Sequence, residues 1–592
     1  MKRYLIFMVI FCLMLVYPAN GTTYYVDAEA GDDAHPGTSV IQPFRTLEKI
    51  RELQLLPGDS ICLAAGQVFR GSLVLRDVRG TADYPVVVTS YSAGTDSYGE
   101  VHDSYPAGHD SHLTGYALAT IDAAGYPDGI LVVNGANIRL GHIRITANGT
   151  VGGHSRGNGP GKTGGNQAAG ESITAGKSAS AGKSLPAGAP DMRCGIRITA
   201  DKQGVFENIQ VHDVHIIDIF YHEPGHTRSK GEVRTANGSG RYGWGIRLIN
   251  QVPGAVLQNL RISDSHVTNV SHTGIKLTAR KEGIRDVVIS GCKVLLTGGP
   301  GIQMSGVRQV IASNNLVDRS GSNDDSRKWG RGSGLWTWGS SDVLIEHNQF
   351  KNAKGPGDSA GCHIDFNCSN VIVQYNFSYH NAGGFIEILG NNYNCAYRYN
   401  ISVNDGYRIK GQDGAFQEGK IFWLSGYQGD REQKGPFNSY IYNNTVFTDQ
   451  DIVAKIAVTK TAAGVLVANN IFCLTGGSLA VKGDQYRPER EGQGKVPRVT
   501  FRNNLFLDPS DWPDEVLIHD EAPLYGNPEF STPGGDQMKD YVPGNKSLVK
   551  DKGMFIPRLP GDEVGLVPGL RVMHDIFGNQ VKGTPDIGAI EL

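Results

Sequence analysis

A short unit of glycine, apolar residue, variable residue and apolar residue recurs along the middle of the chain. Its alternation predicts short β-strands, because successive side chains of a strand point to opposite faces. The units begin 22 to 50 residues apart, with no helical periodicity between them. Such a repeat predicts a solenoid of parallel strands. The glycines that open the units are Gly195, Gly245, Gly274, Gly301, Gly334, Gly361 and Gly383.

A second repeat places an asparagine directly after an alternating segment such as residues 343–347. Asparagine tolerates the left-handed backbone that a sharp corner between strands requires. Asn376 and Asn400 also match the N-glycosylation pattern, but we favour a column of stacked corner asparagines. The predicted column is Asn315, Asn348, Asn376, Asn400, Asn444, Asn470 and Asn504.

The two ends of the chain carry further motifs. Residues 24–33 read Tyr-Tyr-Val-Asp-Ala-Glu-Ala-Gly-Asp-Asp, residues 43–50 read Pro-Phe-Arg-Thr-Leu-Glu-Lys-Ile, and residues 584–591 read Thr-Pro-Asp-Ile-Gly-Ala-Ile-Glu. Together with the repeats, these segments resemble the right-handed parallel β-helix proteins of the pectate-lyase-like superfamily, as found among secreted bacterial carbohydrate-active enzymes. The resemblance implies an all-β, right-handed parallel β-helix (solenoid). It also implies an N-terminal capping helix at residues 44–53, whose apolar residues have helical spacing.

The sequence predicts five regions. A basic start, an apolar run over residues 4–17 and small residues at Ala19 and Gly21 are typical of a signal peptide at residues 1–21, so we expect a secreted or periplasmic protein. Residues 22–150 are the N-terminal cap and first coils, and residues 151–190 are a flexible insertion rich in Gly, Ser and Ala. Residues 191–525 form the main β-helix with the active groove, and residues 526–592 form a C-terminal tail or cap.

The composition of the chain excludes several classes of structure and of binding partner. Glycine supplies 78 of 592 residues, which argues against a coiled coil or a mostly helical protein. The net charge of −3 gives no electrostatic reason to expect a nucleic-acid partner, and no segment of the mature chain is long enough to span a membrane. The spacing of the eight cysteines does not match that of a zinc site. A disulfide between Cys368 and Cys395 is one possible pairing.

The strand pattern also predicts a groove. If the residue after each column glycine points inward, the next one points outward, and stacking at about 4.8 Å turns these positions into a stripe. Two outward tryptophans on one strand favour a ligand-binding surface over an ordinary solvated face. The predicted substrate-binding residues are Arg197, Arg247, Lys276, Gln303, Trp336, Trp338 and Phe385.

Carboxylates follow the aromatic residues. Asp365 and Glu387 are 22 residues apart, so they are predicted to be direct neighbours on adjacent coils. Most glycosidases use two carboxyl groups that flank the glycosidic bond as their catalytic residues. His363 is expected either to orient a carboxylate or to bind a sugar hydroxyl group, and Asp358 is a substitute catalytic carboxylate. A structural role, or a Ca²⁺ ligand, is the alternative for each carboxylate.

The resemblance implies work on polysaccharides. We expect a secreted glycoside hydrolase that cleaves a complex polysaccharide or oligosaccharide, with an anionic sugar in one subsite and no cofactor. One alternative is a polysaccharide lyase, which would use Ca²⁺ and an Arg or Lys base on a uronate. The other is a carbohydrate-binding solenoid without catalysis, in which Asp365 and Glu387 need not share a groove.

Overall fold

The computed structural model describes residues 21–92, 117–148, 192–221, 242–322, 331–481, 498–513 and 519–592. The predicted signal peptide and the predicted insertion at residues 151–190 lie outside these residues, apart from Gly21. None of the described helices is long and apolar enough to cross a membrane.

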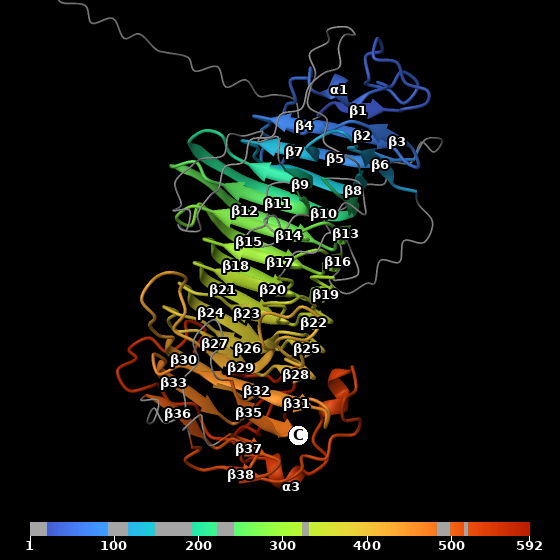
Figure 1. Cartoon of the computed structure of the whole chain (residues 1–592). Coiled ribbons are helices and arrows are strands. Elements are labelled where there is room, and N and C mark those ends of the chain that lie inside the picture. Colours follow the sequence, from blue (N-terminus) through green and yellow to red (C-terminus); the bar gives the residue numbers. More distant parts are fainter. Residues whose placement is uncertain are drawn as a thin grey trace, which may run out of the picture.

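The chain winds through three stacks of parallel strands, and each full turn of the solenoid adds one strand to each stack (Figure 1). Stack 1 is a separate 12-stranded sheet. Its strands, in spatial order, are β4 (Leu73–Arg76), β7 (Asp128–Val133), β9 (Arg193–Thr199), β11 (Gly243–Asn250), β14 (Ile275–Ala279), β17 (Ile302–Ser305), β20 (Leu335–Trp338), β23 (Cys362–Ile364), β26 (Gly384–Ile388), β29 (Lys420–Leu424), β32 (Ala454–Val458) and β35 (Ser478–Ala480).

Stacks 2 and 3 join into one 26-stranded sheet, because β8 (Ile138–Ala147) and β10 (Gly204–Ile219) run through the corner between them. The other strands of stack 2 are β1 (Thr23–Val26), β2 (Ser60–Ala64), β5 (Val86–Tyr91), β12 (Ala255–Ser263), β15 (Ile284–Ser290), β18 (Arg308–Ser313), β21 (Ser341–Glu346), β24 (Ser369–Gln374), β27 (Ala396–Arg398), β30 (Phe437–Tyr442), β33 (Ala463–Ala468) and β36 (Val499–Arg502). Those of stack 3 are β3 (Val68–Arg70), β6 (Ala119–Asp122), β13 (His266–Val270), β16 (Lys293–Thr297), β19 (Leu316–Asp318), β22 (Gln349–Lys351), β25 (Phe377–Tyr379), β28 (Ile401–Val403), β31 (Thr445–Thr448), β34 (Ile471–Leu474), β37 (Leu505–Phe506) and β38 (Leu524–Tyr525).

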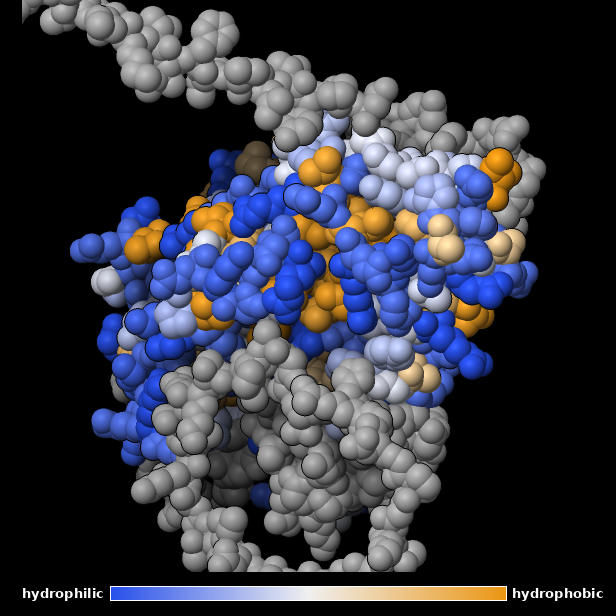
Figure 2. Space-filling view, turned by 90° about the horizontal axis from the view of Figure 1, so that it is seen from above, coloured by the Kyte–Doolittle hydropathy of each residue, from blue (hydrophilic) through white to orange (hydrophobic). Residues whose placement is uncertain are grey.

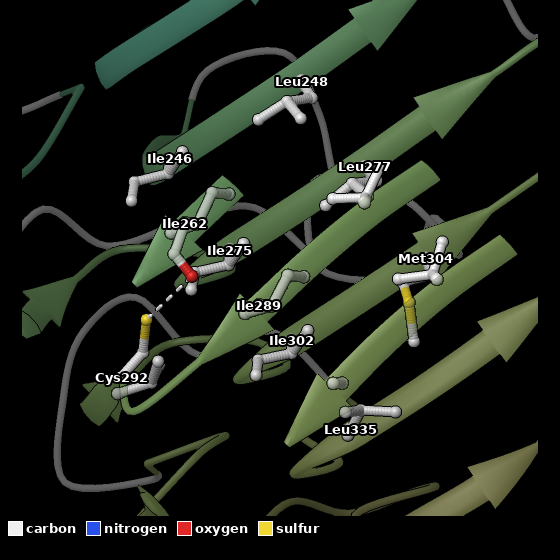
Figure 3. Close-up of a cluster of buried hydrophobic side chains, with 14 of the residues drawn as sticks. Ile246, Leu248, Ile262, Ile275, Leu277, Ile289, Cys292, Ile302, Met304 and Leu335 are labelled. Atoms are coloured by element: carbon white, nitrogen blue, oxygen red, sulfur yellow. Dashed lines mark hydrogen bonds between the residues drawn. The ribbon is translucent and has the colours of Figure 1, made fainter. Parts of the chain in front are cut away.

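The core lies between the stacks and repeats along the solenoid axis. Ile246, Ile275, Ile302 and Leu335 follow one another on successive strands of stack 1, and the side chains of Ile262 and Ile289 lie across from them (Figure 3). These positions directly follow the column glycines, so the predicted inward orientation is confirmed for this column. Burial of like residues on every coil is the main stabilising term.

The asparagine column is confirmed as a buried ladder at the corner between stacks 2 and 3. The side-chain amide of Asn348 donates to Oδ1 of Asn376 at 3.0 Å, and Asn376 repeats the contact to Asn400 at 3.0 Å. The same bond joins each member from Asn315 to Asn504 to the next one. The ladder satisfies backbone groups that the corner removes from the sheets.

The two ends of the solenoid differ. The predicted capping helix at residues 44–53 is not confirmed: only one turn, α1 (Leu47–Ile50), is helical. Figure 2 looks down on this end, where hydrophobic side chains show between hydrophilic ones. Residues 526–592 carry only the short helices η2 (Met538–Tyr541) and α3 (Lys546–Val549). Their apolar side chains pack on the outer faces of stacks 2 and 3, so these contacts do not involve stack 1.

Candidate active site

The residues of the predicted stripe lie side by side on the face of stack 1 that points away from the core, but from Arg197 to His363 they are at most 9% exposed, so the expected open surface is not seen there. Backbone register places Arg197 beside Arg247, Arg247 beside Lys276, and Lys276 beside Gln303. Gln303 is then followed by Trp336 and Trp336 by His363. Since neighbouring strands lie about 4.8 Å apart, these six residues form one continuous line along the sheet.

The register changes at the next strand, and two predictions are wrong there. Ile364 pairs with Ile388, which places Glu387 beside His363 and leaves Asp365 two positions further along its own strand. Asp365 and Glu387 are therefore diagonal rather than direct neighbours. Phe385, predicted to point into the groove, is 1% exposed and packs edge-on against Tyr397 at 5.4 Å between ring centroids.

Two glycines explain the shift. A Cβ on Gly383 would lie 1.8 Å from the carbonyl oxygen of Asp358, and one on Gly384 would lie 1.7 Å from that of Lys420. Gly384 also has φ of +124°, which side chains rarely adopt. These residues let three backbones approach closely, so Gly383 is not the equivalent of the other column glycines.

Asp358 enters the site from the segment before β23. Its Oδ2 lies 3.7 Å from Nε of Arg331, and its φ is +43° in a strained left-handed backbone. The charge of Asp358 acts on Asp365, His363 and Glu387, and that of Arg331 acts on Asp365 and His363. Arg331 carried no signal in the sequence, because only the fold brings it to this strand.

Glu387 and His363 form the floor of the site. His363 Nδ1 lies 3.8 Å from Oε2 of Glu387 and 3.3 Å from Oγ of Ser333. Burial lowers the pKa of His363 to about 4. Burial first, and the charge of Asp358 next, raise the pKa of Glu387 well above its usual value. Both side chains are therefore uncharged near neutral pH.

Asp365 lies at the end of β23 and is half-buried. Its Oδ1 accepts a hydrogen bond from the backbone N–H of Phe366 at 2.8 Å. Burial raises the pKa of Asp365 to about 7, with a further contribution from the charge of Asp358. A carboxyl group that holds its proton near neutral pH has the property that a general acid needs.

Aromatic rings border the carboxylates. Trp336 lies against the His363 ring at 5.5 Å, and Trp338 meets Phe366 edge-on at 5.8 Å. Phe366 in turn meets Tyr427 edge-on at 5.8 Å. We call Trp338, Phe366 and Tyr427 the aromatic wall. Trp338 is 37% exposed, so it is open to a ligand. Sequence reasoning missed Phe366 and Tyr427, which lie in turns beyond the strand pattern.

The next strand adds a cation that the sequence analysis also missed. Register places Trp423 of β29 beside Glu387, and Lys420 Nζ lies 3.7 Å from the centre of the Trp423 ring. The charge of Lys420 acts on Glu387 and opposes the rise of its pKa. Gly419 before this strand aligns with Gly383, which lies outside the glycine column, so the repeat gave no signal for Lys420.

The basic residues lie on the N-terminal side of the aromatic residues. Arg197 pairs with the buried carboxylate of Asp128 at 2.5 Å. Burial lowers the pKa of Arg247 to about 10 and that of Lys276 well below its usual value. Gln303 is fully buried between Lys276 and Trp336. The stripe therefore has the predicted order of cations, aromatic rings and carboxylates.

The described residues contain no group of three His, Cys, Asp or Glu side chains arranged to hold a metal ion. The cysteines in the described part of the chain are buried and free, so Cys368 and Cys395 form no disulfide.

Comparisons with known proteins agree with this architecture. Residues 245–506 match the family described as "Right handed beta helix region". Over 97% of its length the chain is 23% identical to a lacto-N-biosidase of Bifidobacterium longum subsp. longum, and it spans about a third (36%) of that relative.

Two solved structures are similar in fold. A GH136 lacto-N-biosidase from Eubacterium ramulus superposes with a TM-score of 0.51 and 16% identity, over 85% of this chain and 68% of that one. A PL6 family alginate lyase, AlyGC, superposes with a TM-score of 0.51 and 12% identity, over 91% of this chain and 59% of that one. The chain is therefore a right-handed parallel β-helix protein.

Proposed function

We propose that this protein is a glycoside hydrolase that cleaves an oligosaccharide in the groove of stack 1. The similarity to a lacto-N-biosidase along nearly the whole chain supports the reaction class. The observation that carries the proposal is the meeting of Asp358, Asp365 and Glu387 around β23, with one proton held on Asp365 near neutral pH. Glycosidases work with two carboxyl groups in different protonation states.

Asp365 is the proposed general acid. Its raised pKa keeps it protonated up to about pH 7, and its place beside the aromatic wall sets it at the edge of the groove. In the reaction its proton passes to the glycosidic oxygen as the bond to the anomeric carbon breaks.

Asp358 is the proposed partner carboxylate. Its Oδ2 lies 3.7 Å from Nε of Arg331, and Asp358 interacts electrostatically with both Asp365 and Glu387, so we give it the role of nucleophile or general base. Glu387, the partner expected from the sequence, is held neutral by burial and by the charge of Asp358. We therefore propose that Glu387 and His363 bind sugar hydroxyl groups at the floor of the site.

The substrate is proposed to be an oligosaccharide that lies along the stripe. The exposed face of Trp338 suits stacking on a sugar ring, and the buried Trp336 and Gln303 connect it to the cations along the stripe. We also propose export to the periplasm or the medium, on the signal-peptide pattern of residues 1–21.

Product analysis tests the hydrolase proposal. A panel of neutral and acidic oligosaccharides is incubated with the full chain, and products are separated by chromatography and mass spectrometry. New reducing ends with the mass of added water, lost in Asp365→Asn and Asp358→Asn, are expected. Turnover unchanged in both variants would contradict the proposal.

A polysaccharide lyase is the second candidate, favoured by Lys276 alone. A buried lysine with a lowered pKa can act as a base at neutral pH. However, a Ca²⁺-assisted lyase needs several carboxylates beside that base, and among the described neighbours Asp128 is already paired with Arg197. An unsaturated product, seen by its ultraviolet absorbance and lost in Lys276→Met, would favour the lyase over the hydrolase.

A further inference from the structure

Two cations on adjacent strands of stack 1 are buried, and among the described residues no carboxylate forms an ion pair with either of them. Arg247 of β11 and Lys276 of β14 are neighbours in the sheet, at 7% and 2% exposure. Neither forms an ion pair within the described part of the chain. Among the charged groups described there, Arg247 is the one that acts on Lys276, and it repels the charged form of the lysine. Burial of a charge without a partner strongly destabilises a fold.

The ring beside Arg247 is also a hydrogen-bond donor. The guanidinium of Arg247 lies 4.4 Å from the centre of the Trp244 ring. Within the described residues, the buried Nε of Arg247 and Nε1 of Trp244 have no acceptor. Tyr242 and His272 pack around Trp244 at 6.4 and 5.3 Å between ring centroids and fix its ring.

The neighbouring strand shows how the fold balances such a charge. Arg197, next to Arg247 in the register, has the buried carboxylate of Asp128 as its partner at 2.5 Å. On the next two coils, Arg247 and Lys276 have no carboxylate in the place that Asp128 takes beside Arg197, among the described residues. The donors Trp244, Arg247 and Lys276 therefore lack an acceptor that carries negative charge.

We propose that Trp244, Arg247 and Lys276 form a subsite for the carboxylate or sulfate group of an acidic sugar. The assignment rests on the proposed function, because the sugar is a unit of the substrate. Lys276 lies three coils from His363 along the line through Gln303 and Trp336, which is about 14 Å. The acidic unit is therefore bound a short distance from the bond that is cleaved.

Direct binding tests the subsite without turnover. The full chain is titrated by calorimetry with an acidic trisaccharide that carries glucuronate, with its neutral glucose analogue, and with sodium sulfate. We expect the acidic trisaccharide to bind at least tenfold more tightly than the neutral one and than sulfate. Lys276→Met and Arg247→Leu should each lose this preference, whereas Asp365→Asn, which removes the proposed acid, should keep it.

A second measurement covers the folding of the variants. Because Lys276→Met removes an unpaired buried cation, we expect an equal or higher melting temperature than that of the parent chain in buffer without sulfate or phosphate. A folded Lys276→Met variant that still prefers the acidic sugar would overturn the proposal. Sulfate that binds as tightly as the sugar would overturn the assignment to a substrate group. If the full chain bound the acidic trisaccharide but hydrolysed no oligosaccharide, the result would contradict the hydrolase proposal and leave the subsite standing.

Discussion

His363 Nδ1 lies 3.8 Å from Oε2 of Glu387, across two neighbouring strands of stack 1. Burial lowers the pKa of the histidine to about 4 and raises that of the glutamate, so the contact joins two neutral groups near pH 7. Because Glu387 is neutral here, we propose that it binds substrate, and that Asp358 and Asp365 carry out the proton transfer and its partner step.

The first prediction concerns the proposed acid and its partner. Asp365→Asn and Asp358→Asn should each lower kcat by about 10²-fold or more, because proton transfer from a placed acid contributes 10²–10⁴. The rates are measured with the cleaved oligosaccharide at saturating concentration. Asp286→Asn, an exposed carboxylate on stack 2, is the matched control and should keep full activity.

The second prediction concerns Glu387. Since this carboxyl group is neutral, Glu387→Gln preserves its charge and most of its shape, and it should raise KM more than it lowers kcat. Kinetics of the two variants side by side decide the roles. If Glu387→Gln lost as much kcat as Asp358→Asn, Glu387 would be the catalytic partner instead.

The third prediction is a pH dependence. The pKa of Asp365 is raised from 3.8 to about 7, so the acid is present below pH 7 and is lost above it. We expect kcat/KM to fall with rising pH through about 7, and initial rates across buffers of constant ionic strength measure it. Activity that stayed flat to pH 9 would exclude Asp365 as the acid.

The same shift predicts an effect on stability. The folded chain holds this proton more tightly than the unfolded chain, so stability is lost as the pH rises from about 4 to about 7. Asp365→Asn removes the titration, and at pH 8 it should stabilise the fold by ~2–4 kcal/mol relative to the parent. Thermal melts of both proteins at pH 5 and pH 8 test this; an equal difference at both values would contradict it.

The aromatic wall predicts a binding effect. Trp338→Ala removes an exposed ring beside Asp365, and loss of about 1 kcal/mol of stacking should raise KM about fivefold with little change in melting temperature. Ile311→Ala, a side chain of similar exposure on stack 2, is the control. Equal KM values for the two variants would remove Trp338 from the substrate path.

The asparagine ladder predicts a cost in stability. Asn376→Ala deletes two bonds that Asn376 accepts from Asn348 and leaves the carbonyl of Ile345 without its donor. Unsatisfied buried groups of this kind should lower the free energy of unfolding by roughly 3 kcal/mol. Guanidinium unfolding of this variant and of Asn527→Ala, an exposed asparagine, measures the difference; equal midpoints would show that the ladder contributes nothing.

The sequence by itself determined the solenoid, its corner asparagines and the outward line from Arg197 to His363. Each of these depends on local alternation and on a repeat, and both are visible in the order of residues. The helical spacing at residues 44–53 was a weaker signal, because four apolar positions cannot by themselves hold more than the single turn of α1.

Only the tertiary structure decided the site. The spacing of 22 residues suggested that Asp365 and Glu387 were direct neighbours, but the close approach of backbones at Gly383 and Gly384 shifts the register by two and buries Phe385. Arg331 and Tyr427 join the site from turns, where no periodicity exists to place them. Register and burial set the charge of each acid, and both depend on contacts between coils that are distant in the chain.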